Sequence, residues 1–196
     1  MGAVYVKDYG APPLDRREIL RYLRTDTVSA ELEGELSQAL KDALPTLSYR
    51  VCYAEFPMSV ESGELDLGFT RVTSRDLAKN LAGCTHITVF AATVGLGIDR
   101  LIARYSSLSP VRALCLQAIG AERIEALCDA FQTDIRYASC GGRVHARFSP
   151  GYGDLPLTFQ REIFRVLDCP RRIGLSLNES LLMSPSKSVT ALIGIE

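Results

Sequence analysis

Apolar residues recur every three or four positions in several stretches of the chain, a spacing typical of amphipathic helices. The clearest stretches cover residues 14–24, 30–44, 98–105, 110–131 and 156–167. Ser29 and Ser109 stand where N-cap residues are expected, and Pro110 suits the first position of the helix that follows Ser109. Gly120 inside this long helix costs about 1 kcal/mol relative to alanine, which indicates close backbone packing there.

Strands are predicted where apolar and polar residues alternate, or where a short apolar run lies between turn residues. Residues 47–56 and 65–69 alternate on either side of a turn at 61–63, which predicts an antiparallel pair. The run HITVFAATVG at 86–95 is largely apolar and predicts a buried central strand. A short capped helix at 73–83 separates these two features.

The last third of the chain predicts a further hairpin and a closing strand. Residues 135–140 and 143–148 flank the Gly-Gly pair at 141–142, which suits a two-residue hairpin turn. Arg147 lies on the polar face of the second of these segments. The apolar run SVTALIGI at 188–195 predicts the last strand.

Hairpins and helices in this uneven order favour the α+β class. We expect a mixed, largely antiparallel sheet with hairpins that is packed by several helices, and not a doubly wound Rossmann sheet. Residues 1–84 form an N-terminal helical and hairpin region, and residues 85–196 form the region that carries the candidate site. We expect the two regions to fold as one compact unit.

Composition narrows the classes of function. Of the 196 residues, 47% are hydrophobic and the formal net charge is −1, so a globular core is expected and nucleic acid is not an expected partner. No apolar run reaches the roughly 18 residues of a spanning helix, so no membrane is expected either. The cysteines form no C-x-x-C pair, which favours reduced core thiols and a cytoplasmic location. They are Cys52, Cys84, Cys115, Cys128, Cys140 and Cys169.

Two candidate catalytic features have little chemical support. The segment FAATVGLGID at 90–99 joins a strand to a helix through glycines, as a phosphate-binding turn does, but it matches neither of the usual glycine-rich nucleotide motifs. Cys140 and His145 would need an orienting carboxylate to act as nucleophile and base, and none is apparent. With two histidines and no clustered carboxylates, we expect no metal site and assign no catalytic residue.

The corner HARFSPGYGD at 145–154 is more specific. Arg147 ends a strand, and its guanidinium fork suits a carboxylate or a phosphate. Pro150 and Gly151 build a tight loop, in which we expect Gly151 to adopt a positive φ or to let a ligand approach closely. Tyr152 adds a ring for stacking and a hydroxyl group. From the residues alone, a ligand site and an ordinary surface turn are equally good interpretations.

Acidic residues follow one face of the long predicted helix. Glu122 and Glu125 lie three residues apart, and Asp129 continues the face from Glu125. A solvated acidic face is the simpler interpretation. The alternative is a carboxylate placed near a cationic ligand.

Two motifs resemble the signatures of a known family, the activation domain of vitamin B12-dependent methionine synthase. The stretch RFSPGYGD at 147–154 is similar to its S-adenosylmethionine-binding signature, Arg-x-x-Pro-Gly-Tyr. The run LSLNESLLMSPSKSVT at 175–190 resembles its second signature, and LQAIGAERIEAL resembles a helix of small and acidic residues. The residues on the second pattern are Glu179, Ser180, Met183, Pro185, Ser188 and Val189. The resemblance covers about residues 85–195.

The resemblance implies a fold like that of the activation domain and a role in reactivating cobalamin, as the activation part of a methyltransferase. In this family a reductant, here expected to be of the flavodoxin or ferredoxin type, supplies an electron to inactive cob(II)alamin. S-adenosylmethionine then gives its methyl group to the reduced cobalt. The cobalamin is expected on a partner protein, because the chain has no cobalamin-binding motif of its own.

The resemblance also assigns site residues. The arginine would hold the methionine carboxylate and the loop would cradle the ligand; these residues are Arg147, Pro150, Gly151 and Tyr152. An acidic residue on the long helix would offset the sulfonium charge, with Glu122 as first choice and Glu125 as second.

We expect the chain to act on a separately encoded, truncated cobalamin-dependent methionine synthase or a related corrinoid protein. Two rival interpretations stay open beside this expectation. The first rival is a docking or regulatory module of a corrinoid methyltransferase system that no longer uses S-adenosylmethionine, which an end at Glu196 soon after the second signature favours. The second rival, an unrelated enzyme acting at residues 90–98, lacks a catalytic set.

Overall fold

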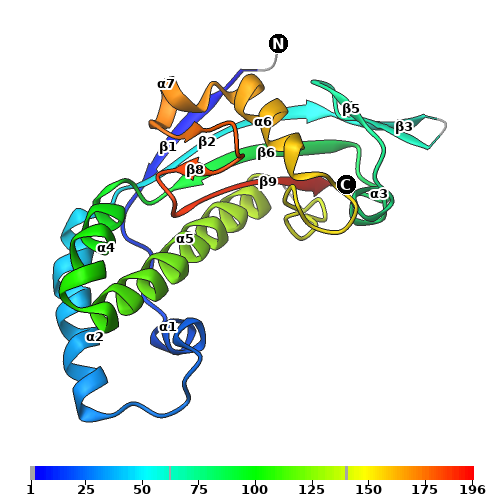
Figure 1. Cartoon of the computed structure of the whole chain (residues 1–196). Helices are drawn as coiled ribbons and strands as arrows, with labels where there is room; N and C mark the ends of the chain where they lie inside the picture. The colour runs from blue at the N-terminus through cyan, green and yellow to red at the C-terminus, as the bar shows by residue number, and fades with distance from the viewer. Residues whose placement is uncertain (1–2, 62, 140) are drawn as a thin grey trace.

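The computed structural model describes residues 3–61, 63–139 and 141–196. Within them the main sheet has four antiparallel strands in the order β1-β2-β6-β9, and Figure 1 shows this sheet running through the upper part of the molecule. The strands are β1 (Tyr5–Tyr9), β2 (Tyr49–Pro57), β6 (His86–Thr93) and β9 (Ser188–Ile195). Antiparallel strands combined with several helices confirm the predicted α+β class.

Two smaller, separate sheets accompany the main one. A three-stranded sheet contains β3 (Ser59–Glu61), β4 (Glu64–Asp66) and β5 (Arg71–Val72). A two-stranded hairpin contains β7 (Ser176–Leu177) and β8 (Met183–Ser184). The hairpin lies beside the N-terminal half of β9 and forms part of the candidate site (Figure 1).

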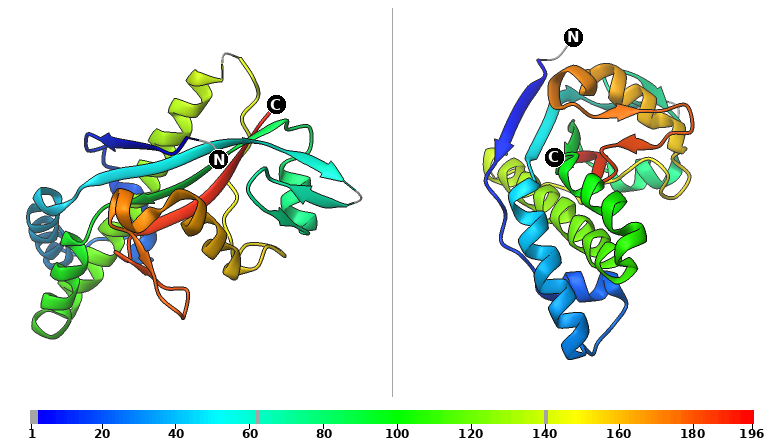
Figure 2. Two further views of the ribbon diagram at one scale, coloured as in Figure 1. Left: turned by 90° about the horizontal axis from the view of Figure 1, so that it is seen from above. Right: turned by 60° about the vertical axis from the view of Figure 1, so that its left-hand side comes forward.

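Helices cover both faces of the main sheet (Figures 1 and 2). The helices that share a core with one face are α1 (Arg16–Leu23), α2 (Ala30–Ala43), α4 (Gly97–Leu108) and α5 (Pro110–Ala138). The helices packed on the opposite face are α3 (Arg75–Asn80), α6 (Gln160–Leu167) and α7 (Cys169–Ile173). Short 3-10 turns precede β2 and α6, namely η1 (Leu44–Thr46) and η2 (Leu157–Phe159).

Strand β6 supplies side chains to both cores, as expected for a central strand. Phe90 and Ala92 belong to the core on the α5 face. Ile87 and Val89 belong to the core on the α6 face. All four side chains are fully buried, which explains why the apolar run at 86–95 shows no polar alternation.

The predicted pairing of residues 47–56 with residues 65–69 is wrong. Strand β2 pairs with β1 and β6 instead, whereas β4 pairs with β3 and β5. The sequence did not indicate β1, because this edge strand is mostly exposed and its residues, YVKDY, carry no apolar alternation. Without β1 the neighbouring segment along the chain was the natural partner for β2.

The predicted hairpin over residues 135–148 is also wrong. The helix α5 continues through Ala138, because the buried side chain of Ile135 extends its apolar stripe by another turn. Residues 143–148 bridge to β9 instead and lie along its outer edge. The segment therefore has a strand-like course, as predicted, but its partner comes from the end of the chain.

Close packing and one buried ion pair hold α5 against its neighbours. A Cβ atom on Gly120 would lie 2.9 Å from Cγ of Lys187, so glycine permits the close approach that the sequence indicated. Arg123 donates to both carboxylate oxygens of Glu122 at 2.5 Å, and the two side chains are 1% and 3% exposed. The same guanidinium donates to the carbonyl groups of residues 12–13. The pair therefore fixes the N-terminal segment to α5.

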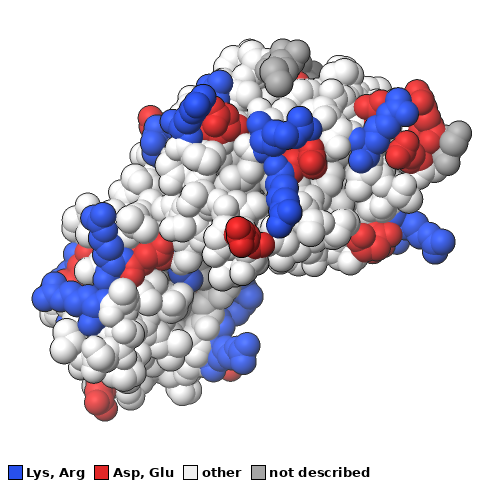
Figure 3. Space-filling model, turned by 45° about the horizontal axis from the view of Figure 1, so that its top comes forward, with Lys and Arg blue, Asp and Glu red and all other residues white. Residues whose placement is uncertain are grey.

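The described surface mixes charges of both signs. In Figure 3 most of the lysine and arginine side chains on the visible face have acidic neighbours. Among the ion pairs of the described residues, Arg50 and Asp8 lie 2.9 Å apart. Across the residues that the structure describes, no helix combines the length and the apolar character needed to cross a membrane. The cysteines among these residues are buried and free, namely Cys52, Cys84, Cys115, Cys128 and Cys169; Cys140 lies outside the described residues.

Candidate functional site

Residues 143–148 run along the outer edge of β9 and carry Arg147 to the mouth of a cavity. Phe148 and Leu192 exchange backbone hydrogen bonds of 2.9 Å in both directions. Beyond Phe148 the chain turns away, and no strand of the described chain covers the edge of β9 around Thr190. In an antiparallel strand the backbone groups of alternate residues point the same way. The backbone N–H and C=O groups of Thr190 therefore face this open edge, just as the same groups of Leu192 face Phe148.

The loop at residues 149–154 has a fixed shape. Gly151 has a φ of +91°, which confirms the predicted positive φ. At the far end of the loop, the carboxylate of Asp154 accepts hydrogen bonds from the hydroxyl of Ser74 and, at 2.8 Å, from the backbone N–H of Arg75. These hydrogen bonds hold the pKa of Asp154 below its ordinary value. The loop is thereby attached to the N-terminus of α3.

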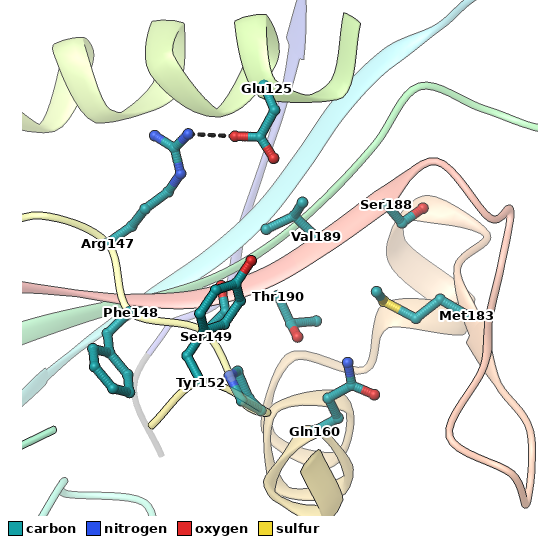
Figure 4. A pocket seen from close by; sticks show the side chains of 11 residues that line it. Glu125, Arg147, Phe148, Ser149, Tyr152, Gln160, Met183, Ser188, Val189 and Thr190 are labelled. Carbon is teal, nitrogen blue, oxygen red and sulfur yellow. Dashed lines mark hydrogen bonds and ion pairs between the residues drawn. The ribbon is translucent and has the colours of Figure 1, made fainter. Parts of the chain in front are cut away.

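A cavity of about 410 Å³ opens at this edge of the sheet. Its walls come from α5 on one face, α6 on the other, the loop, the β7–β8 hairpin and β9 (Figure 4). The volume lies in the range of sites for small organic ligands. The lining residues are Glu125, Arg147, Phe148, Ser149, Pro150, Tyr152, Gln160, Met183, Ser188, Val189 and Thr190.

The end of the cavity next to α5 is charged. Arg147 donates to Glu125 at 2.5 Å, to Asp129 at 2.6 Å and to Oε1 of Gln132 at 3.2 Å. Burial alone would lower the pKa of Arg147, but the hydrogen bonds to Asp129 and Glu125 outweigh it and raise the pKa above its ordinary value. The guanidinium is therefore always charged, and it faces the cavity beside a carboxylate (Figure 4).

The end of the cavity next to α6 is neutral and incompletely hydrogen-bonded. Gln160 and Thr190 line it, and their Oε1 and Oγ1 atoms are buried without a partner among the described residues. Ser188 differs, because its hydroxyl oxygen lies within hydrogen-bond distance of two partners, 2.9 Å from Oγ1 of Thr93 and 2.8 Å from the carbonyl oxygen of Pro185. Buried polar atoms are normally paired, so these two lining residues have hydrogen-bonding capacity left for a ligand.

Most of the predicted site residues meet at this cavity. Arg147, Pro150, Tyr152 and Glu125 line it, and Tyr152 is 70% exposed. Gly151 is not among the lining residues, and its backbone shapes the loop between two of them. Their roles toward a ligand remain predictions.

Glu122, the first choice for the acidic residue, lies elsewhere. Both of its carboxylate oxygens accept hydrogen bonds from Arg123, and one also accepts the backbone N–H of Asp15 at 2.9 Å. It borders a second cavity between α1 and α5, which shares Glu125 and Arg147 with the first. Of the two acids weighed from the sequence, Glu125 is therefore the one that lies beside Arg147.

The second motif reaches the same cavity from the other end of the chain. Met183 on β8 and Ser188 and Val189 on β9 line it. Glu179, Ser180 and Pro185 are not among the lining residues. Two further lining residues were harder to recognise from the sequence. Gln160 lies beyond the loop motif, and Thr190 follows Val189, the last pattern position of the second motif.

The two remaining candidate features, the turn at residues 90–98 and His145, have structural explanations. A Cβ atom on Gly95 would lie 2.4 Å from Oγ of Ser48, and one on Gly97 would lie 2.3 Å from the carbonyl oxygen of Thr46. These glycines therefore serve close packing at the 90–98 turn. Both ring nitrogens of His145 face hydrogen-bond acceptors: Nδ1 lies 2.5 Å from the carbonyl oxygen of Asn80, and Nε2 lies 2.7 Å from Oε1 of Glu196. Hydrogen bonding to the carboxylate raises the pKa of His145.

Comparison with known proteins gives a matching family and several similar solved structures. The model of the family described as "Vitamin B12 dependent methionine synthase, activation domain" matches residues 69–195. A solved structure, "Crystal Structure of the MetH Reactivation Domain bound to AdoHcy", aligns with a TM-score of 0.74 and 18% sequence identity. The alignment covers 98% of this chain and 78% of that one. No curated protein sequence matches significantly.

The loop geometry predicts the effect of substituting Gly151. Alanine there must adopt a φ of +91°, and its Cβ atom would lie 3.2 Å from Cδ1 of Leu157. Gly151→Ala should therefore lower the free energy of unfolding by about 1–3 kcal/mol, as expected for a strained backbone. Chemical denaturation measures this change.

Gly10→Ala is the matched control, because Gly10 has open space around it and no positive φ. It should change the free energy of unfolding by less than about 0.5 kcal/mol. Equal effects of the two substitutions would contradict the strained loop geometry.

Proposed function

Because this chain belongs to the family of vitamin B12-dependent methionine synthase activation domains, we propose that it binds S-adenosylmethionine and supports reductive methylation of cob(II)alamin. The cobalamin is carried by a cobalamin-dependent methionine synthase or a related corrinoid protein. A flavodoxin- or ferredoxin-type protein supplies the electron. The chain thus acts as the activation part of a methyltransferase.

The observation that carries this proposal is the division of the cavity into a charged and a neutral end. Glu125 and Arg147 are the charged side chains among the described lining residues, and both lie at the α5 end. S-adenosylmethionine has the same division, with an amino acid at one end and a neutral nucleoside at the other. The AdoHcy bound to the similar solved structure has this division too, which supports the proposal.

At the charged end, the ion pair of Arg147 with Glu125 can be exchanged for pairs with the ligand. The amino-acid group is a zwitterion, so it offers a carboxylate to Arg147 and an ammonium group to Glu125. Asp129 and Gln132 continue to hold the guanidinium from behind. The exchange leaves no buried charge without a partner, which would otherwise be costly.

The loop and the open edge of β9 then position the methyl donor. Pro150 and Tyr152 line the cavity beside Arg147, and the loop that carries them is attached to α3 through Asp154. The partner's corrinoid supplies a cobalt centre that is reduced and accepts the methyl group. Methyl transfer requires reacting atoms about 3–3.5 Å apart. The contribution of this chain is therefore to place the donor where a docked partner can reach it.

A reconstitution experiment tests the proposed function. A methionine synthase that lacks its activation domain is loaded with cob(II)alamin and mixed with S-adenosylmethionine, reduced flavodoxin and this chain. The visible spectrum should change to that of methylcobalamin, and omission of the chain should stop this change. Equal rates with and without the chain would rule out reactivation and favour the docking or regulatory module.

Substitution of Arg147 tests the charged end of the site. Arg147→Ala should weaken the binding of S-adenosylmethionine by about 2–4 kcal/mol, because a ligand carboxylate would lose its charged partner. This equals roughly 30- to 1,000-fold in the dissociation constant. Arg147→Lys should recover part of the loss, since lysine keeps the charge but lacks the fork. Calorimetric titration measures each affinity.

Arg112 provides a matched control on α5. Its side chain is 22% exposed against 23% for Arg147, and it donates to Glu35 at 2.8 Å away from the cavity. Arg112→Ala should leave the affinity unchanged. Unchanged affinity in Arg147→Ala as well would remove Arg147 from the binding site.

A further inference from the structure

The neutral end of the cavity contains two buried side chains with unused hydrogen-bonding capacity. Gln160 is 6% exposed and Thr190 is 2% exposed. Within the described chain, Oε1 of Gln160 and Oγ1 of Thr190 have no hydrogen-bond partner. Leaving such atoms unpaired in a folded core is unfavourable. Both residues line the cavity, so a ligand bound there can take up hydrogen bonds that the protein leaves unmade.

The two side chains approach the cavity from different elements on the same face of the sheet. Gln160 is the first residue of α6. The side chain of Thr190 points to the α6 face, because Leu192, two residues further along β9, belongs to the core on that face. Figure 4 shows Gln160 below Thr190, and Arg147 with Glu125 across the cavity from them.

The chemistry of this end favours a neutral heterocycle. The charged lining residues of the described chain, Glu125 and Arg147, lie at the other end, so a phosphate group would have no cation here. A glutamine carboxamide presents an acceptor and a donor side by side. Adenine presents the matching set, the 6-amino group beside a ring nitrogen, and glutamine pairs with it through two hydrogen bonds.

We infer that Gln160 is the residue that selects adenine in this site, with the hydroxyl of Thr190 as a second contact for the same nucleoside. This inference rests on the proposed function, because it assumes that an adenosyl compound occupies the cavity. It adds a specificity-determining residue on α6, outside both sequence motifs.

The test compares two ligands and two proteins by calorimetry. The ligands are S-adenosylhomocysteine and the analogue in which purine, without the 6-amino group, replaces adenine. The parent chain should bind the analogue about 10- to 100-fold more weakly, because Oε1 of Gln160 loses its donor. Gln160→Leu should bind S-adenosylhomocysteine more weakly by a similar factor and should discriminate between the ligands less than about threefold.

The stability of the same variant separates recognition from a structural role. Gln160→Leu removes a buried oxygen that has no partner, so its melting temperature without ligand should equal or exceed that of the parent. Thr190→Val should lower the affinity about three- to tenfold. Thr88→Val is its matched control, because Thr88 is also fully buried with an unpaired hydroxyl but is not among the residues that line the cavity.

The outcomes distinguish this inference from the proposed function. If the parent binds both ligands equally, or if Gln160→Leu still discriminates between them, the inference is overturned while adenosyl binding stands. If the parent does not bind S-adenosylhomocysteine at all, the proposed function fails and the inference fails with it.

Discussion

The site depends on a sheet edge that is only partly paired. The segment 143–148 covers the C-terminal half of β9 through backbone hydrogen bonds such as those between Phe148 and Leu192. The pairing ends before Pro150, which has no N–H group to continue a ladder. Gly151 then turns the chain away with its positive φ. The gap that results between α5 and α6 is the cavity, and its walls are the two layers that cover the sheet.

Two ion pairs that involve α5 have different roles: the pair of Glu122 with Arg123 is structural, whereas the pair of Glu125 with Arg147 faces a cavity. Glu122 and Arg123 are almost completely buried and hold the N-terminal segment. Glu125 and Arg147 are more exposed and face a cavity on each side of their ion pair. A ligand can exchange partners with the second pair at little cost, whereas breaking the first would leave a buried charge uncompensated.

The sequence was sufficient for the elements whose pattern is local. The central strand, the long helix with its N-cap at Ser109 and the positive φ of Gly151 all follow from neighbouring residues. Strand partners were predicted poorly, because pairing depends on contacts between distant segments. The segment 143–148 carried the right periodicity, but nothing in it indicates that its partner is β9.

The difference between local patterns and contacts between distant segments applies to the site as well. The motif residues around Arg147 were recognisable, and the structure brings them together with Met183, Ser188 and Val189 of the second motif. The choice between Glu122 and Glu125 could not be made from their spacing, because it depends on Arg123, which points to the N-terminal segment. Gln160 was not recognisable either, since an unpaired buried oxygen is a property of packing in three dimensions.

A crystal structure of the chain with S-adenosylhomocysteine would test the central claim most directly. We predict one ligand in the cavity at the edge of β9. Its carboxylate should lie at Arg147, its ammonium group at Glu125 and its base at Gln160. A ligand bound elsewhere on the chain, or an ion pair of Arg147 and Glu125 left unchanged beside an empty cavity at saturating ligand, would contradict this claim.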